Sequence, residues 1–208
     1  MSSPRASGPV PSLSPAWVSG TAALLCYAIH AGFHLLHGRP HDLLWACHIG
    51  AAIVGVGLLA SSATVNGIGT LFLWLGTPLW LMEVVTGHEE FNPTSCFTHV
   101  GGLVLGLYGT YRLGMPKGVW WKAVAVLVGL IGLCRLTTPA YANVNVAFAI
   151  PSGWEKQFAS HGTYLVTVIG LVAGYFFITQ LVIRLALGLL KRQSGTEKRA
   201  ALGLEGRP

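Results

Sequence analysis

Six long apolar runs, separated by shorter polar stretches, set the pattern of hydrophobic and polar positions along the chain. Each run is close to the roughly 20 residues that an α-helix needs to cross the hydrocarbon core of a bilayer. The pattern therefore predicts an all-α polytopic membrane protein, built as a bundle of six transmembrane helices. We expect these helices at residues 17–36, 43–60, 68–85, 96–113, 119–136 and 164–190.

Composition supports a lipid environment. Of the 208 residues, 52% are hydrophobic and 10% are charged, and the mean hydropathy is +0.60. A soluble domain carries about 25% charged residues, so a typical soluble enzyme is excluded. Residues 1–16 are rich in Pro and Ser and predict a flexible N-terminal tail, residues 17–190 form the six-helix domain, and residues 191–208 form a basic cytoplasmic tail.

Basic residues orient the predicted helices. With a cytoplasmic N-terminus, the outer segments hold three basic residues, namely Arg39, Arg135 and Lys156. The cytoplasmic segments hold nine, namely Arg5, Arg112, Lys117, Lys122, Lys191, Arg192, Lys198, Arg199 and Arg207. The positive-inside rule then predicts that both termini face the cytoplasm. We interpret the net charge of +6 as a topology signal, and expect no nucleic-acid partner.

Polar and ionisable residues gather at the outer end of this topology. Such groups are costly at membrane depth, so their convergence predicts a polar pocket between the helices that opens to the outer side. Glu83 has apolar neighbours on both sides and needs a partner, for which His88, His99 and Arg135 are candidates. The residues expected to shape the pocket are His48, Glu83, Asn143, Asn145 and His161.

Two chemistries remain open for this pocket. Cys47 is a potential nucleophile, and His99 enters the membrane from the same side at a similar depth, so that we expect these two residues to form a catalytic pair. His48 is excluded as the base because neighbouring residues on a helix point about 100° apart. Alternatively, histidines four residues apart on one helix offer a metal or haem face, as at His30 and His34 or at His37 and His41.

The remaining cysteines and the glycines predict packing. Cys26, Cys96 and Cys134 belong to no CxxC pair, and a small buried hydrophobe is the ordinary role of an isolated cysteine in an apolar segment. Small residues at helical spacing allow helix backbones to approach closely in lipid. We expect such packing faces at Gly102, Gly106 and Gly109, and at Gly129 and Gly132.

Four segments resemble the bacterial YwaF-like integral-membrane family over about residues 41 to 165. They are LLWACHIGAAIVGVGLL, LFLWLGTPLWLM, CFTHVGGLVLGLYGTYRLGMPKGVWWKA and YANVNVAFAIPSG, in this order. The family is similar to a eukaryotic transmembrane acyltransferase of ether phospholipids in which a Cys and a His act together. The resemblance implies that Cys47 of the ACH segment and His99 of the TH pair occupy those positions, although Trp45 and His48 stand where the family more often has His and Asp.

Together these features predict a protein of the bacterial cytoplasmic membrane, and two functions stay open. The first is a lipid-directed acyltransferase or hydrolase that uses Cys47 and His99, with membrane lipid as its partner and no cofactor. The second is a non-catalytic protein that binds a small molecule, a metal, a haem or a partner membrane subunit through the same pocket.

Overall fold

The computed structural model describes residues 15–87 and 90–201, with side chains described for residues 16–87 and 90–193. All regular structure in these residues is helical. The long helices are α1 (Pro15–Leu36), α2 (Ala46–Leu59), α3 (Ala63–Val85), α5 (Gly102–Leu113), α6 (Val119–Thr137) and α7 (His161–Ala201). The short ones are α4 (Pro93–Cys96), the π-helical segment η2 (Phe97–Gly101) and the 3-10 turns η1 (Pro40–Leu44), η3 (Ala140–Ala142), η4 (Val144–Val146) and η5 (Glu155–Gln157).

The predicted all-α fold and its six helices are confirmed within the described residues, since α4, η2 and α5 follow one another as one helical run. Four helices, α1, α3, α6 and α7, are long and apolar enough to cross a membrane. The predicted boundaries need correction at α7, which continues to Ala201, so that part of the predicted basic tail is helical. Residues 1–14, 88–89 and 202–208, which include the rest of both predicted tails, lie outside the described residues.

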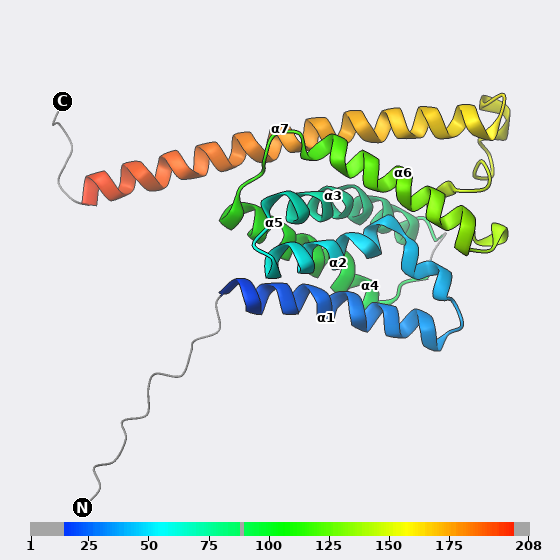
Figure 1. Cartoon of the computed structure of the whole chain (residues 1–208), viewed down its shortest axis with the longest axis horizontal. Helices are drawn as coiled ribbons and strands as arrows, with labels where there is room; N and C mark the ends of the chain where they lie inside the picture. The colour runs from blue at the N-terminus through cyan, green and yellow to red at the C-terminus, as the bar shows by residue number, and fades with distance from the viewer. Residues whose placement is uncertain (1–14, 88–89, 202–208) are drawn as a thin grey trace, which may run out of the picture.

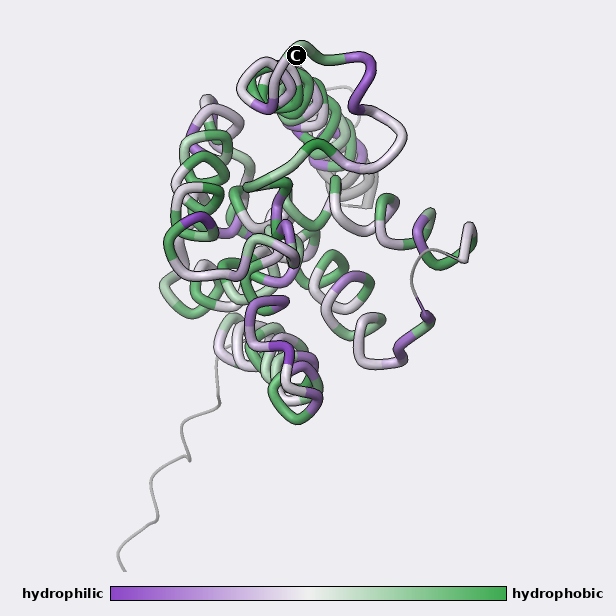
Figure 2. Tube along the Cα trace, turned by 90° about the vertical axis from the view of Figure 1, so that its right-hand side faces the viewer, coloured by the Kyte–Doolittle hydropathy of each residue, from purple (hydrophilic) through white to green (hydrophobic). Residues whose placement is uncertain are grey.

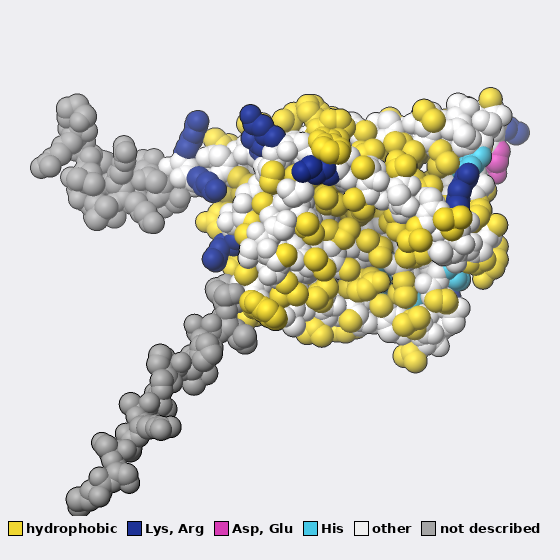
Figure 3. All heavy atoms as spheres, viewed as in Figure 1, with side chains coloured by type: hydrophobic (Ala, Val, Ile, Leu, Met, Phe, Trp, Pro, Cys, Tyr) yellow, Lys and Arg dark blue, Asp and Glu magenta, His cyan; other side chains and the backbone are white. Residues whose placement is uncertain are grey.

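The helices alternate in direction, so α1 begins and α7 ends at the same end of the bundle (Figure 1). Helix α2 packs between α1 and α3, while α6 and α7 pack against each other. Figure 2 looks onto the opposite end of the bundle and shows α1 and α7 at opposite edges. The space-filling view shows apolar side chains over most of the long face, with Lys and Arg concentrated near the end where α7 finishes (Figure 3).

Two irregular places in the helices, the proline inside α3 and the π-helical turn η2, are stabilised by hydroxyl groups of neighbouring helices. Pro78 lies inside α3 and lacks the N–H that would bond to the carbonyl of Trp74. The Tyr175 hydroxyl of α7 donates to that carbonyl at 3.3 Å. In η2, the carbonyl of His99 accepts a hydrogen bond from the Thr77 hydroxyl of α3 at 3.1 Å. The π-helical turn that carries His99 is therefore held by α3.

Glycines allow α2, α3 and α5 to approach closely, as predicted for Gly102, Gly106 and Gly109. A Cβ atom added at Gly109 would lie 2.4 Å from Oδ1 of the buried Asn66, and one added at Gly106 would lie 2.8 Å from the Thr70 hydroxyl. The prediction is wrong for Gly129 and Gly132, where an added Cβ meets no atom within 4 Å. These two glycines of α6 make no close helix contact among the described residues.

Gly57 is the glycine at which we expect a substitution to disturb the bundle strongly. A Cβ at this position would lie 2.3 Å from the backbone nitrogen of Asn66. This atom belongs to the backbone of α3 and cannot move aside as the end of a flexible side chain could. Gly57→Ala should therefore lower the free energy of unfolding by about 1–3 kcal/mol, the usual cost of overpacking. Thermal melting in detergent measures the effect, with Gly132→Ala as the control, and equal melting temperatures for the two variants would contradict this packing.

Candidate metal centre

Four buried histidines from three helical segments lie together near the end of the bundle where α1 finishes. His30 and His34 lie one turn apart on α1, His48 lies in the first turn of α2, and His99 lies in η2. Their exposed fractions are 1%, 7%, 6% and 1% respectively. Buried polar groups need partners, so the partners of the two nitrogens of each ring define what the cluster can do.

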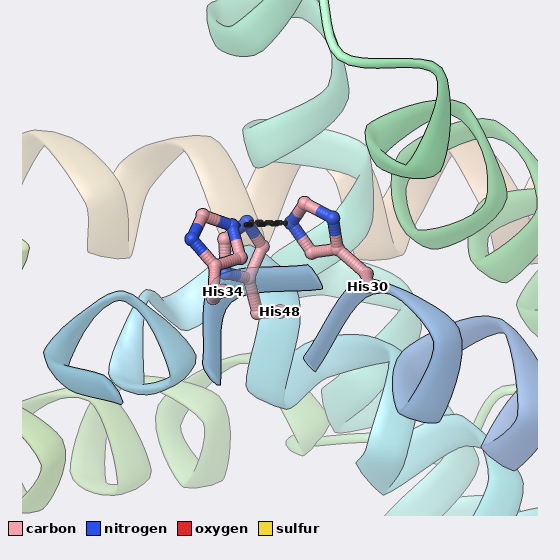
Figure 4. A group of neighbouring side chains, drawn as sticks. All are labelled: His30, His34 and His48. Atoms are coloured by element: carbon pink, nitrogen blue, oxygen red, sulfur yellow. Dashed lines mark hydrogen bonds between the residues drawn. The ribbon is translucent and has the colours of Figure 1, made fainter. Parts of the chain in front are cut away.

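Three of these rings point toward one another (Figure 4). The Nε2 atom of His30 lies 3.0 Å from Nε2 of His48 and 3.1 Å from Nε2 of His34. The three histidines offer nitrogen atoms that all lie within 4.8 Å of one another, a spacing that suits ligands of one metal ion. The arrangement follows from the i, i+4 spacing on α1, which puts both rings on the face that α2 covers.

The opposite nitrogens of His34 and His48 are both held by Asp42 in η1. Nδ1 of His48 lies 2.7 Å from the backbone carbonyl of Asp42, and Nδ1 of His34 lies 3.1 Å from its carboxylate. A carbonyl only accepts hydrogen bonds, so Nδ1 of His48 carries the hydrogen of its ring. The nearby carboxylate favours the same tautomer in His34, although its Nδ1 is not aligned for a hydrogen bond among the described residues. The Nε2 atoms of His34 and His48 therefore present lone pairs to the centre.

His30 reaches the same state through a hydroxyl. Its Nδ1 atom lies 2.8 Å from the Thr94 hydroxyl, which itself donates to the Asn92 side-chain oxygen at 3.0 Å. A hydroxyl has one hydrogen, so the Thr94 oxygen accepts from Nδ1 of His30. Nε2 of His30 is then a third lone pair, and three lone pairs at these separations repel one another unless a cation lies between them.

His99 adds a fourth such nitrogen. Its Nδ1 atom lies 3.1 Å from the carbonyl of Ser95, so that Nε2 carries the lone pair, and this buried Nε2 has no hydrogen-bond partner among the described residues. The ring stacks on Trp80 with a centroid distance of 4.7 Å and an interplanar angle of 8°. Trp80 contributes a buried indole N–H that also lacks a partner among these residues.

The geometry fits a tetrahedral transition-metal site. Imidazole nitrogens bind zinc at about 2.0–2.1 Å, so neighbouring ligands of a tetrahedral ion lie roughly 3.3–3.4 Å apart. The separations of 3.0 and 3.1 Å are within a few tenths of an ångström of this value. Two axial haem ligands would instead lie on opposite sides of the iron, about 4 Å apart, with the macrocycle between them. The contacts therefore favour a metal ion over haem.

Asp42 keeps a negative charge beside the centre. Burial alone would raise the pKa of its carboxyl group, but the neighbouring imidazole groups of His34 and His41 and the indole N–H of Trp45 outweigh burial and lower the pKa. Arg39 and His41 also face this carboxylate, at 3.6 and 3.7 Å. A carboxylate that holds the distal nitrogen of a histidine is the usual outer partner of a metal ligand, because it fixes the ring and strengthens the nitrogen as a donor.

The structure brings the predicted pair, Cys47 and His99, into one neighbourhood. Cys47, His48 and His99 offer a sulfur and two nitrogens that all lie within 4.8 Å of one another. Cys47 faces α3 at Gly76, where an added Cβ would lie 2.4 Å from the Cβ of Cys47. Helix geometry excluded His48 as the base for Cys47, but the His48 side chain belongs to both groups of ligand atoms.

The other predicted pocket residues do not join His48. Glu83 is exposed on α3, contrary to the expected buried carboxylate, and His88 lies outside the described residues. Asn145 is buried and accepts from the backbone N–H of Ala46, so that it caps the start of α2 and positions the turn before Cys47. Where the sequence predicts a pocket, the described residues show a cluster of buried histidines.

Asn143 and His161 stabilise the connection between α6 and α7. The Asn143 side-chain oxygen accepts from the backbone N–H groups of Phe148 and Ala149. His161 accepts from Arg135 at Nδ1 and donates from Nε2 to the carbonyl of Val146, each at 2.9 Å. All nitrogens of His161 are thereby used within the connection, so this histidine is unavailable to the centre.

Three contributors were missed at the level of the sequence. Asp42 contacts His48 through its backbone carbonyl, and Thr94 contacts His30 through its hydroxyl. Trp80 stacks on His99. No spacing along the sequence predicts any of these contacts. The signal that existed was the pair His30 and His34, four residues apart, which supported the metal alternative.

Comparison of the chain with protein-family models, with curated proteins and with solved structures finds no match in any of the three. The functional assignment therefore depends on the geometry of the centre.

Proposed function

We propose that this chain is an integral membrane protein that holds one divalent transition-metal ion, zinc, through Nε2 of His30, His34 and His48. The observation that carries the proposal is the hydrogen-bond arrangement around these rings. An oxygen lies within 3.1 Å of every Nδ1 atom, which favours the tautomer with the hydrogen on Nδ1, and the three Nε2 atoms face one another at the centre. Such an arrangement is unfavourable without a cation and is typical of ligands whose tautomer has been fixed by outer partners.

Six transmembrane helices are part of the proposal. Four helices have the required length and hydropathy, and the run 93–113, interrupted only by η2, spans a comparable length. The even number of helices brings the ends of the bundle to one side, and the positive-inside rule supports a cytoplasmic location for both termini. The bacterial cytoplasmic membrane is the membrane that this charge distribution and the YwaF-like resemblance favour, with lipid as the immediate partner.

Ligand chemistry favours zinc. Imidazole nitrogen is a good donor for zinc, copper, iron and nickel, whereas magnesium and calcium prefer oxygen. Zinc accepts a tetrahedral arrangement readily, and three protein ligands with a fourth position for another group is a common arrangement around it. The two separations between Nε2 of His30 and the Nε2 atoms of His34 and His48 are close to those of a tetrahedral ion.

Metal content of the purified protein tests the proposal. We expect about one zinc ion per chain by mass spectrometry after purification in detergent without chelator, and a loss of at least tenfold in affinity for His48→Ala. His37→Ala is the matched control, because His37 is an exposed histidine of the same region whose ring contacts the Phe33 carbonyl. A wild-type protein that stays metal-free in the presence of zinc, or a control that loses zinc equally, would contradict the proposal.

Acyl transfer through Cys47 is a second candidate function. It is supported by the proximity of Cys47 and His99 and by the resemblance of the ACH and TH segments to the YwaF-like family. The histidine would take the thiol proton, and the thiolate would attack the acyl carbonyl of a lipid to form a thioester. The ester bond would break, and the lipid alcohol would leave with the proton from the histidine. This chemistry requires the thiol and no metal, which separates it from the function proposed first.

A further inference from the structure

We propose that the zinc centre hydrolyses an acyl ester of a membrane lipid, with His99 as the general base that takes the proton of a zinc-bound water. This inference rests on the proposed function, because it needs the metal held by His30, His34 and His48. It goes beyond metal binding by assigning a reaction and a substrate class.

The number of histidine ligands indicates a catalytic site. Three histidines offer nitrogens that can converge on one ion. A tetrahedral ion with three protein ligands has a fourth position, which catalytic zinc sites keep for water. Zinc lowers the pKa of a bound water to about 7, so that hydroxide forms at neutral pH. A closed structural site would instead use four protein ligands.

His99 is placed and protonated as a general base requires. Its Nε2 atom is buried, carries a lone pair and has no hydrogen-bond partner among the described residues, while its ring lies 5.6 Å from the ring of His48. A buried acceptor without a partner is costly, and a zinc-bound water beside His48 would supply the missing hydrogen. The unpartnered indole N–H of Trp80, stacked on His99, is suited to donate to the carbonyl oxygen of a substrate.

The depth of the histidine cluster in the bilayer favours a lipid ester as the substrate. His30 precedes the end of α1 by six residues and His99 follows the start of α4 by six, which puts each roughly 9 Å from the helix end. The polar layer on each side of a bilayer is roughly 5–8 Å thick, so the centre lies near the boundary where the ester groups of lipids are found. The outer cover is thin, because the side chains of His34 and Asp42 remain 9% and 17% exposed.

The reaction balances without an oxidant or reductant. The zinc-bound water gives its proton to Nε2 of His99, and the hydroxide oxygen forms a bond to the acyl carbonyl carbon. The ester bond between that carbon and the alcohol oxygen then breaks, and His99 returns the proton to the departing alkoxide. The products are a fatty acid and a lipid that has lost one acyl chain.

The test uses full-length protein reconstituted in phosphatidylglycerol and phosphatidylcholine vesicles that contain a phospholipid with a fluorogenic acyl ester. We expect zinc-dependent release of the fluorescent acid, loss of release on chelation, and recovery when zinc is added back. His99→Gln should retain the zinc, which also reports an intact fold, while the rate falls by about 100-fold or more. The control Cys96→Ser should keep the rate within about twofold.

Each contrary result separates this inference from the proposed function. Zinc at one ion per chain with no release of acid would overturn the hydrolysis and leave the metal centre intact. Loss of zinc in His99→Gln would make His99 a fourth ligand and exclude it as the base. Release that survives chelation and disappears in Cys47→Ser would replace the zinc hydrolysis by thiolate chemistry. A protein that binds no zinc would overturn both proposals.

Discussion

Removal of zinc should lower the melting temperature of the wild-type protein by about 8–16 °C. A ligand that binds only the folded state at 1,000 times its dissociation constant adds about 4 kcal/mol of stability, and a change of 1 kcal/mol moves the midpoint of a chain of this size by about 2–4 °C. The effect has a local cause as well, since stripping the ion leaves three facing lone pairs on α1 and α2. Melting of zinc-loaded and chelator-treated samples in the same detergent measures the shift.

Acidic pH should abolish the difference in melting temperature between the zinc-loaded and the chelator-treated protein. Imidazole must be neutral to bind zinc, and protons compete with the ion as the pH falls below the ordinary histidine pKa of about 6.5. Asp42 does not contribute to this transition, because its lowered pKa keeps its carboxylate charged throughout that range, and its own stabilising contribution disappears only at more acidic pH. A zinc-dependent shift in melting temperature that stayed the same at pH 5 would contradict zinc binding by histidines.

Asp42→Ala should weaken zinc binding by about 10- to 100-fold although Asp42 does not touch the ion. The substitution removes the carboxylate that lies 3.1 Å from Nδ1 of His34 and leaves the backbone carbonyl that accepts from His48. His34 can then turn or change tautomer, so its Nε2 lone pair is no longer directed at the centre. Competition titration with a chromogenic chelator gives the affinity.

Two further variants test whether Asp42 acts by positioning the His34 ring or only by its negative charge. Asp42→Asn retains a side-chain oxygen that accepts from His34, so it should recover much of the affinity that Asp42→Ala loses. Arg39→Gln removes a charge that lies 3.6 Å from the same carboxylate without touching any ligand, and it should leave the affinity nearly unchanged. Equal losses in Asp42→Ala and Arg39→Gln would show that Asp42 acts only through the local potential.

The helices could be predicted from the sequence because hydropathy reports length and burial in lipid directly, and each predicted run contains a helix. Their ends were less predictable. Helix α7 continues past Leu190 into charged residues, where the helix propensity of the residues, and no longer their hydropathy, determines how far the helix extends. Gly129 and Gly132 have the spacing of a packing face, but spacing does not tell which face of α6 meets a neighbour.

The centre was only partly predictable, for a related reason. Periodicity along α1 brings His30 and His34 to one face, and a similar depth brings Cys47 and His99 to one level. Whether all of these face the same point depends on helix rotation and on the π-helical turn at η2, which changes the register of His99 relative to Pro93. The role of Asp42 depends on the fold of η1, which no periodic pattern describes. Glu83 failed as a pocket residue because an apolar neighbourhood in sequence does not imply burial in the bundle.

X-ray absorption at the zinc edge of the purified protein tests the central claim most directly. The account predicts a first shell of three imidazole nitrogens at about 2.0–2.1 Å and one further light atom, with the outer-shell scattering of histidine rings. The spectrum of His48→Ala should lose this pattern, and that of His37→Ala should retain it. A zinc shell of oxygen alone, or a spectrum unchanged in His48→Ala, would contradict a centre built from His30, His34 and His48.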